Sequence, residues 1–312
     1  MTRSIRVGTS GYTFDDWRGL VYPRNLKGSA LAHYARLFDC VEVNTTFYRV
    51  PRPALFTGML RHVPDDFTFL IKLPREMTHE RESFDRVVVP FAEAVTPVVK
   101  AGQLGGLLAQ FPYSFKRSDT ALDQLRRIAD TFVGHGVPIN VEFRHDSWLD
   151  DTVYQFLEAH GLGFVNVDLP ELPGLPGRTN VVTSDVAYYR LHGRNRKNWW
   201  RNTGNPHDRY DYTYSDVQLD EWVHNARMAA PKAEATYILT NNCRLGQSVI
   251  SALMLAKRLG LPQPTPPPGL PIEMIEPTRE ERIEELKRGL QAARTETGRS
   301  RRRPKPRTEC ET

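Results

Sequence analysis

The sequence predicts a single (β/α)8 TIM barrel in the α/β class, and three observations lead to this fold. Eight short apolar runs, rich in β-branched and aromatic residues, alternate with amphipathic segments over residues 5–259 of the 312-residue chain. The runs are continuous, which is typical of strands that are buried on both faces of a parallel sheet. Such a barrel takes roughly 250 residues, and the chain supplies that length before its composition changes.

The predicted strands and helices follow one another in the order that a barrel requires. The apolar runs lie at residues 5–8, 40–45, 67–73, 104–111, 139–143, 163–169, 187–191 and 236–241. Helical spacing predicts helices at residues 29–38, 84–100, 119–132, 150–160, 215–229 and 246–259. A doubly wound open sheet is the alternative, but Gly8-Thr-Ser-Gly11 lacks the glycine spacing of a dinucleotide site and the lysine of a P-loop.

The composition changes after residue 261, where we place a domain boundary. Residues 261–271 are rich in proline, which predicts an extended linker that no helix continues through. Residues 279–294 have the spacing of one charged helix, and six basic residues lie in 299–307. We therefore divide the chain into a barrel, 1–261, and a Pro-rich linker with a charged tail, 262–312, that is disordered or helical.

Composition and cysteine usage exclude several classes of protein. No run approaches the ~18 apolar residues of a membrane span, and no secretory signal is visible at the start. Three scattered cysteines, Cys40, Cys243 and Cys310, argue against a disulfide framework or a structural zinc site. We therefore expect a cytoplasmic protein without a membrane partner, and the oligomeric state stays open.

Polar side chains stand at the carboxyl end of every predicted strand, and in a barrel these ends meet at one mouth. Burying a charged group without a partner costs several kcal/mol, so we expect a compensating network there. Four predicted strands carry two polar residues two positions apart, so that both point the same way. The pairs are Glu42 with Asn44, Glu142 with Arg144, Asn166 with Asp168, and Arg190 with His192.

We predict that these side chains form an active site, with Glu42 or Glu142 as general base and His192 or His145 as acid. A purely structural ion network of Glu42, Lys72, Glu142 and Arg144 inside the mouth is the alternative. The predicted catalytic residues are Glu42, Lys72, Glu142, His145, Asp168 and His192. The predicted ligand-binding residues are Thr9, Ser10, Tyr12, Asn44, Gln110, Arg144, Arg190, Arg194, Trp199, Tyr210, Asn241 and Asn242.

Several of these side chains are also metal-ligating types, but the sequence does not predict a metal. No local motif such as HExxH is present. Arg144 and Arg190 stand beside the carboxylates and would repel a cation. We therefore predict neither a metal nor a cofactor.

The segment 194–214, after the seventh predicted strand, holds five basic residues, two tryptophans and three tyrosines. Cationic and aromatic groups together suit a sugar phosphate, a base or a nucleic-acid backbone. Alternatively, Trp199 and Trp200 only hold a long loop against the barrel. The barrel segment has a net charge of only +3, which is weak for broad contact with a nucleic-acid backbone.

Short motifs along residues 5–260 closely resemble the YecE-like family, domain of unknown function 72. They are VGTSGY at 7–12, WRG at 17–19, VEVNTTFY at 41–48, FLIK at 69–72, LAQFP at 108–112, VEFRH at 141–145, YRLHG at 189–193, and the paired asparagines at 241–242. The resemblance implies a TIM barrel, similar in fold to the xylose-isomerase and endonuclease-IV group, and no established reaction. Family members usually follow the paired asparagines with His, whereas Cys243 stands here.

Three functions remain open on these observations. The first is an enzyme acting on a phosphorylated or otherwise anionic small molecule by hydrolysis, isomerisation or lyase chemistry. The second is a nucleic-acid binding or processing protein, and the third is a ligand-binding barrel without turnover. For all three we expect Glu142 to be buried, to face the barrel interior and to pair with Lys72, Arg144 or Arg190. We also expect Glu142→Gln to keep the fold and to remove ligand binding or activity, whereas binding that survives substitution of Glu142 and His192 would favour the third function.

Overall fold

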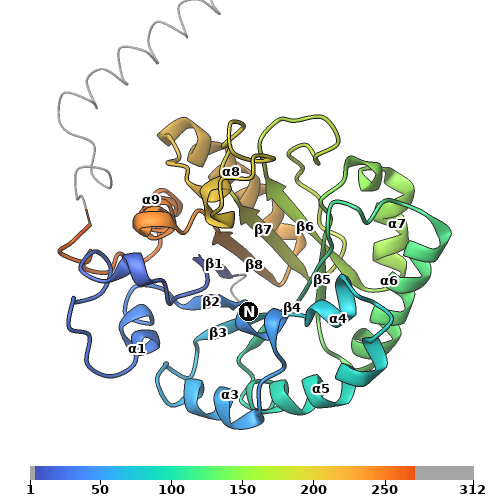
Figure 1. Ribbon diagram of the computed structural model, residues 1–312, viewed down its shortest axis with the longest axis horizontal. Helices are drawn as coiled ribbons and strands as arrows, with labels where there is room; N and C mark the ends of the chain where they lie inside the picture. Colours follow the sequence, from blue (N-terminus) through green and yellow to red (C-terminus); the bar gives the residue numbers. More distant parts are fainter. Residues whose placement is uncertain (1–3, 271–312) are drawn as a thin grey trace, which may run out of the picture. The chain divides into compact units, whose positions relative to one another are not determined.

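The computed structural model describes residues 4–270, which form a closed barrel of eight parallel strands (Figure 1). The strands are β1 (Ser4–Ser10), β2 (Cys40–Val43), β3 (Thr68–Lys72), β4 (Leu104–Gln110), β5 (Ile139–Glu142), β6 (Leu162–Asp168), β7 (Val186–Leu191) and β8 (Ala235–Thr240). Each strand pairs with the next in sequence, and β8 closes the barrel on β1 from Ser4↔Ala235 to Thr9↔Thr240. The predicted fold class is therefore confirmed.

Helices surround the strands in Figure 1, and most of them lie where the sequence predicts. They are α1 (Ala30–Tyr34), α2 (Thr45–Tyr48), α3 (Pro53–Leu60), α4 (Arg75–Thr78), α5 (Phe84–Lys100), α6 (Asp119–Phe132), α7 (Asp151–Ala159), α8 (Asp216–Ala229) and α9 (Gln247–Leu259). The bounds of α5 and α6 agree with the prediction. Sequence periodicity missed α2, α3 and α4, because α2 and α4 are single turns and α3 is apolar on several sides.

The barrel interior changes from apolar to polar at the last inward position of several strands. Cys40, Leu70, Leu108, Tyr188 and Leu239 belong to one buried cluster. Two residues further along the same five strands, the inward positions are polar, and they are Glu42, Lys72, Gln110, Arg190 and Asn241. The polar layer therefore lies directly on the apolar core, at the C-terminal end of the barrel.

The connection between β6 and β7, residues 169–185, has no helix. The Asn166 side chain holds it by donating from Nδ2 to the Val181 carbonyl at 2.8 Å and accepting from the Val181 N–H at 2.9 Å. Val165 and Val167 belong to the buried cluster inside the barrel. The prediction that Asn166 and Asp168 face the mouth is therefore wrong, because both point to the outer face of the strand.

The compact unit runs to Leu270, beyond the boundary that the sequence predicts. The Leu270 side chain is buried, and Gly269 lies so close to the backbone of Gly19 and Leu20 that a Cβ atom would overlap it. Gly269 and Leu270 therefore pack on the barrel unit. The predicted helix at 279–294 and the basic run at 299–307 lie outside the described residues.

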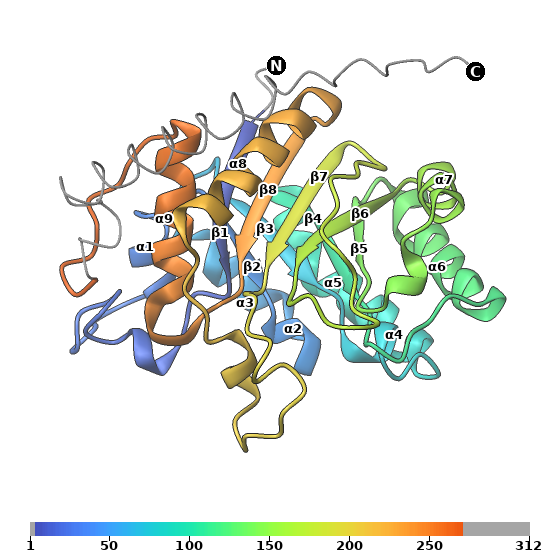
Figure 2. The ribbon, with the colours of Figure 1, turned by 90° about the horizontal axis from the view of Figure 1, so that it is seen from above.

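No helix within residues 4–270 has both the length and the apolar character needed to cross a membrane. The Figure 2 view shows the segment that leads from β7 to α8 at the same end of the barrel as α2 and α4. This end is the C-terminal mouth, where the strands finish.

We expect Gly8→Ala to lower the free energy of unfolding by about 1–3 kcal/mol. The added Cβ would overlap the carbonyl oxygen of Cys40 in the neighbouring strand β2. Urea denaturation measures the change. Gly58→Ala is the matched control: its Cβ meets nothing within 4 Å, and it lies inside α3. Alanine is favoured there by roughly 0.5–1 kcal/mol, so equal effects of the two substitutions would contradict the packing described for β1.

Candidate functional site

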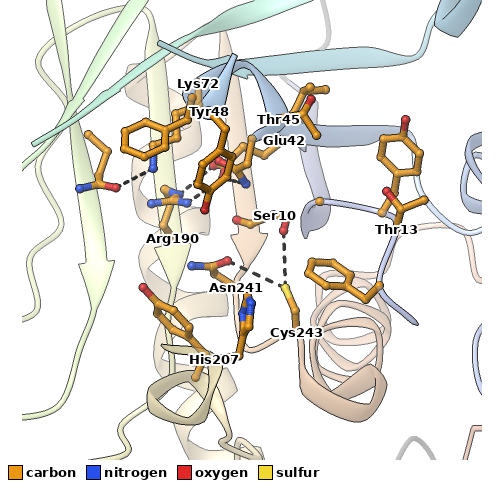
Figure 3. A pocket seen from close by; sticks show the side chains of 18 of the residues that line it. Ser10, Thr13, Glu42, Thr45, Tyr48, Lys72, Arg190, His207, Asn241 and Cys243 are labelled. Atoms are coloured by element: carbon orange, nitrogen blue, oxygen red, sulfur yellow. Dashed lines mark hydrogen bonds and ion pairs between the residues drawn. The ribbon is translucent and has the colours of Figure 1, made fainter. Parts of the chain in front are cut away.

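A cavity of about 440 Å³ opens at the C-terminal mouth of the barrel (Figure 3). Its floor is the polar layer of the strand ends, and its walls include residues of the loop after β1, of α2 and of the segment after β7. Ten predicted site residues line it: Ser10, Tyr12, Glu42, Asn44, Lys72, Gln110, Arg144, Arg190, Tyr210 and Asn241. The predicted convergence of the strand ends on one site therefore holds for these residues.

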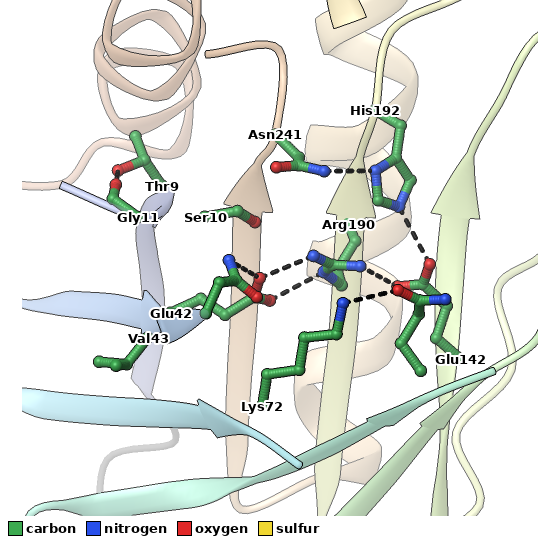
Figure 4. Close-up of polar contacts among 12 residues, drawn as sticks. Thr9, Ser10, Gly11, Glu42, Val43, Lys72, Glu142, Arg190, His192 and Asn241 are labelled. Atoms are coloured by element: carbon green, nitrogen blue, oxygen red, sulfur yellow. Dashed lines mark hydrogen bonds and ion pairs between the residues drawn. The ribbon is translucent and has the colours of Figure 1, made fainter. Parts of the chain in front are cut away.

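Arg190 lies at the centre of a buried ion network (Figure 4). Its Nε and Nη2 donate to the two carboxylate oxygens of Glu42 at 2.8 and 2.7 Å. Its Nη1 donates to Glu142 Oε2 from the other side. Glu42 and Glu142 are fully buried, so the guanidinium joins strands β2, β5 and β7 inside the barrel.

Two neutral groups also donate hydrogen bonds to the carboxylate oxygens of Glu42. Tyr188 donates its hydroxyl proton to Oε2 at 2.6 Å, and Asn44 Nδ2 donates to Oε1 at 2.9 Å. Burial alone would raise the pKa of this carboxyl, but the Arg190 charge and these hydrogen bonds hold it below its ordinary value. Glu42 is therefore a fixed anion and a weak base.

Glu142 is held in the same way, beneath the cavity rather than in its lining. It pairs with Arg144 Nε and with Arg190, and these two charges outweigh burial and hold its pKa well below the ordinary range. The prediction that Glu142 is buried, faces the interior and pairs with arginine is confirmed.

His192 lies between Glu142 and Asn241 and is fully buried. Its Nε2 is 3.3 Å from Glu142 Oε1, and its Nδ1 is 2.9 Å from Asn241 Nδ2. Burial and the nearby Arg144 charge lower its pKa to about 3. The ring is therefore neutral at pH 7 and does not suit the predicted role of a general acid.

Lys72 differs from the other charged groups of the floor. Its Nζ donates to Gln110 Oε1 at 2.7 Å and lies 4.0 Å from the centre of the Phe47 ring. Within residues 4–270, no carboxylate forms an ion pair with it. Burial, followed by the Arg190 charge, lowers its pKa to about 7. This amine therefore exchanges its proton in the neutral range.

Four predicted site residues point away from the cavity, and each has a structural partner. Thr9 Oγ1 donates to the Gly11 carbonyl and lies 3.0 Å from the Tyr34 hydroxyl. His145 Nδ1 accepts from the Ser147 N–H at 3.1 Å at the start of a 3-10 turn. Asp168 accepts from Trp222 Nε1 on α8, and Asn242 donates to the Tyr212 carbonyl.

Several residues of the segment after β7 that the sequence predicts to bind a ligand instead contact other residues of the protein. Arg194 pairs with Asp168 at 2.9 Å and with Glu221 at 2.9 Å. The Trp199 side chain is buried and packs edge-on against Tyr210. The side chains of Arg194, Trp199 and Tyr210 therefore hold the segment onto the barrel. Trp200, in contrast, is exposed.

The sequence interpretation missed several residues of the site. Phe47 and Tyr48 enter the cavity lining from α2, which periodicity did not predict, although both lie in the VEVNTTFY motif. Tyr188 stands two residues before Arg190, which was the signal that it shares the inward face.

Cys243 also lines the cavity, and its Sγ is 3.5 Å from the Ser10 carbonyl oxygen. Burial raises the pKa of this thiol to about 12. It is therefore protonated and does not suit a nucleophile or a thiolate ligand. In residues 4–270, no three His, Cys, Asp or Glu side chains are grouped so that they could hold a metal ion.

We expect Glu142→Gln to lower the free energy of unfolding by about 3–5 kcal/mol, because it leaves Arg144 and one edge of Arg190 without a buried counter-charge. The sequence alone led us to expect that this variant keeps its fold and loses ligand binding or activity. The buried ion pairs lead us to expect a loss of stability as well. Urea denaturation measures the loss. Glu171→Gln is the matched control, since Glu171 forms an exposed ion pair with Arg178, and such pairs contribute about 1 kcal/mol at most. Similar losses for the two variants would contradict the buried network.

We expect the stability of the protein to rise with pH between about 3 and 6.5, in part because of His192. In this range the unfolded imidazole binds a proton that the buried ring does not bind, so acid favours the unfolded state. His192→Gln should make this slope shallower, measured by urea denaturation at several pH values. His135→Gln, at an exposed histidine, should leave the slope as it is. An unchanged slope in His192→Gln would refute the assignment.

Comparison with known proteins places this chain in a family. The family model "Protein of unknown function DUF72" matches residues 6–272. The UPF0759 protein YunF of Bacillus subtilis is 24% identical over 253 residues, which are 76% of this chain and 88% of YunF. The UPF0759 protein YecE of Escherichia coli K12 is 29% identical over 147 residues, which are 45% of this chain and 52% of YecE.

Two solved structures have the same barrel. A DUF72 family protein of Thermotoga maritima is 36% identical, with a TM-score of 0.74 over 82% of this chain and 99% of its own. A DUF72 family protein of Enterococcus faecalis is 24% identical, with a TM-score of 0.76 over 85% of this chain and 98% of its own. These matches confirm the resemblance read from the motifs, and the chain belongs to the DUF72 family.

Proposed function

We propose that this protein is an enzyme that acts on a small anionic molecule, a phosphorylated compound or a carboxylate, bound in the cavity at the mouth. The observation that carries the proposal is the charge of the cavity floor. Glu42 and Glu142 are already paired with Arg190 and Arg144, which leaves Lys72 as the additional cation. An anion placed against Lys72 and Arg144 would supply the missing counter-charge.

The size and walls of the cavity suit a small organic ligand. A volume of about 440 Å³ is in the range of pockets for small molecules. Aromatic rings form much of the wall above the charged floor, and they are Tyr12, Phe14, Phe47, Tyr48 and Tyr210. A ligand with an anionic group at the floor and a carbon skeleton or ring against these walls fits both regions.

Lys72 is the group that we propose for proton transfer. A catalytic acid or base works best when its pKa lies near the working pH, and the Lys72 pKa is about 7. Glu42, Glu142 and His192 do not meet this condition, and we assign them the task of positioning Arg190 and Arg144. An amine whose pKa lies near 7 at the floor of a cavity favours an enzyme over a protein that binds its ligand without turnover.

We expect sulfate, whose charge is constant in the neutral range, to bind more weakly as the pH rises above about 7, by up to about tenfold per pH unit. The reason is that Lys72 loses its positive charge there. Isothermal calorimetry from pH 6 to pH 9 measures this dependence. Lys72→Met should weaken binding and remove the pH dependence, whereas Lys116→Met, at an exposed lysine, should change neither. Binding that is independent of pH and of Lys72 would place the anion elsewhere.

A further inference from the structure

We infer that Lys72 forms a covalent imine with its substrate, so that the substrate is an anionic aldehyde or ketone such as a 2-oxo acid or a phosphorylated sugar in its open form. This inference rests on the proposed function and deepens it, because the amine that gives up its proton then acts as the nucleophile. The anionic group would be held at Arg144, and the carbonyl carbon would lie at the Lys72 amine.

The hydrogen-bond partner of Lys72 leaves the amine free to react. An ion pair with a carboxylate would favour the ammonium form, which has no lone pair. The partner here is instead the neutral amide oxygen of Gln110, which accepts one N–H at 2.7 Å. The face of the Phe47 ring lies 4.0 Å from the nitrogen, and this cation–π contact favours the ammonium form less than an ion pair with a buried carboxylate would. A lysine nitrogen in this setting keeps its lone pair for attack on a carbonyl carbon.

Desolvation and the Arg190 charge favour the neutral amine in the same way, and together they outweigh the opposite effect of Glu142 and Glu42. Desolvation and a second cationic group are the two means by which proteins activate a lysine nucleophile. Lys72 is subject to both, because it is half-buried at the end of β3 with its amine desolvated, and the Arg190 and Arg144 charges lie near it. Its pKa of about 7 means that near neutral pH about half of the molecules carry a reactive amine.

The two carboxylates of the floor raise the pKa of Lys72, but neither forms an ion pair with it. Both oxygens of Glu42 and both oxygens of Glu142 already contact arginine. Arg144 is only partly buried and lines the same cavity as Lys72. Gln110 ends β4, which lies between β3 and β5 in the barrel, and it accepts a hydrogen bond from the Lys72 amine. A bifunctional ligand can therefore meet a cation and a nucleophile in one cavity.

The proposed step is balanced without an oxidant or a reductant. The Lys72 nitrogen forms a bond to the carbonyl carbon, and both hydrogens of the neutral amine pass to the carbonyl oxygen, which leaves as water. One proton from solvent then converts the imine to the iminium. The iminium withdraws electrons from the neighbouring carbon, so it would promote loss of a proton there or cleavage of the adjacent carbon–carbon bond.

Borohydride trapping tests the inference on the full-length protein. The protein is incubated with pyruvate, with dihydroxyacetone phosphate or with neutral dihydroxyacetone, and sodium borohydride is added. An iminium is reduced to a stable secondary amine, so the intact mass should rise by that of the probe less one oxygen atom. Peptide mapping should place the adduct on Lys72, and trapping should increase through pH 7 as the amine loses its proton.

Variants separate the imine from simple anion binding. Lys72→Met and Lys72→Arg should both abolish the adduct, and Lys72→Arg keeps the positive charge if Lys72→Met does not fold. Lys116→Met should trap as well as the unmodified protein. Adducts distributed over surface lysines and unaffected by these substitutions, or no adduct with any of the three probes, would overturn the imine. If sulfate still binds in that case, the imine is rejected and the proposed function stands. If dihydroxyacetone is trapped and no anion binds, the imine stands and the anionic substrate is rejected.

Discussion

The sharing of one guanidinium between two buried carboxylates governs the whole mouth of the barrel. Arg190 contacts Glu42 on one side and Glu142 on the other, and all three side chains are removed from solvent. Buried charges are tolerated only when they are paired and hydrogen-bonded, so the ends of β2, β5 and β7 must keep their relative positions. Because the carboxylates are engaged in this way, Lys72 faces the cavity with an amide partner and an altered pKa.

The ionic layer lies directly on the apolar core, and one residue, Tyr188, belongs to both. Its ring is part of the buried cluster, and its hydroxyl donates to Glu42. Close packing below the layer leaves no room for water to solvate the charges from that side. The charges are therefore satisfied by one another and by whatever occupies the cavity above them.

The sequence predicted the barrel and most of its strand ends, because continuous apolar runs and the polar residues that follow them are local signals. It did not predict the register of β6. Polar and apolar residues alternate there, and Asn166 and Asp168 find their partners in Val181 and Trp222, which are distant in sequence. The sequence also could not show that the pKa of Glu42 is lowered, so that it stays an anion, or that the pKa of Lys72 lies near 7. Both pKa values depend on distances between strands.

The ion pairs of Arg190 join residues that are far apart in the sequence. This separation has a consequence for the order in which the chain can fold. Glu42 precedes its arginine by 148 residues and Glu142 precedes it by 48. During synthesis, the first half of the barrel therefore emerges with a carboxylate whose counter-charge has not yet been made. That half can collapse on its apolar faces but cannot bury its last inward position until β7 arrives. The ionic layer is thus completed late in barrel closure, because Glu42 meets Arg190 only when strands from both halves are in place.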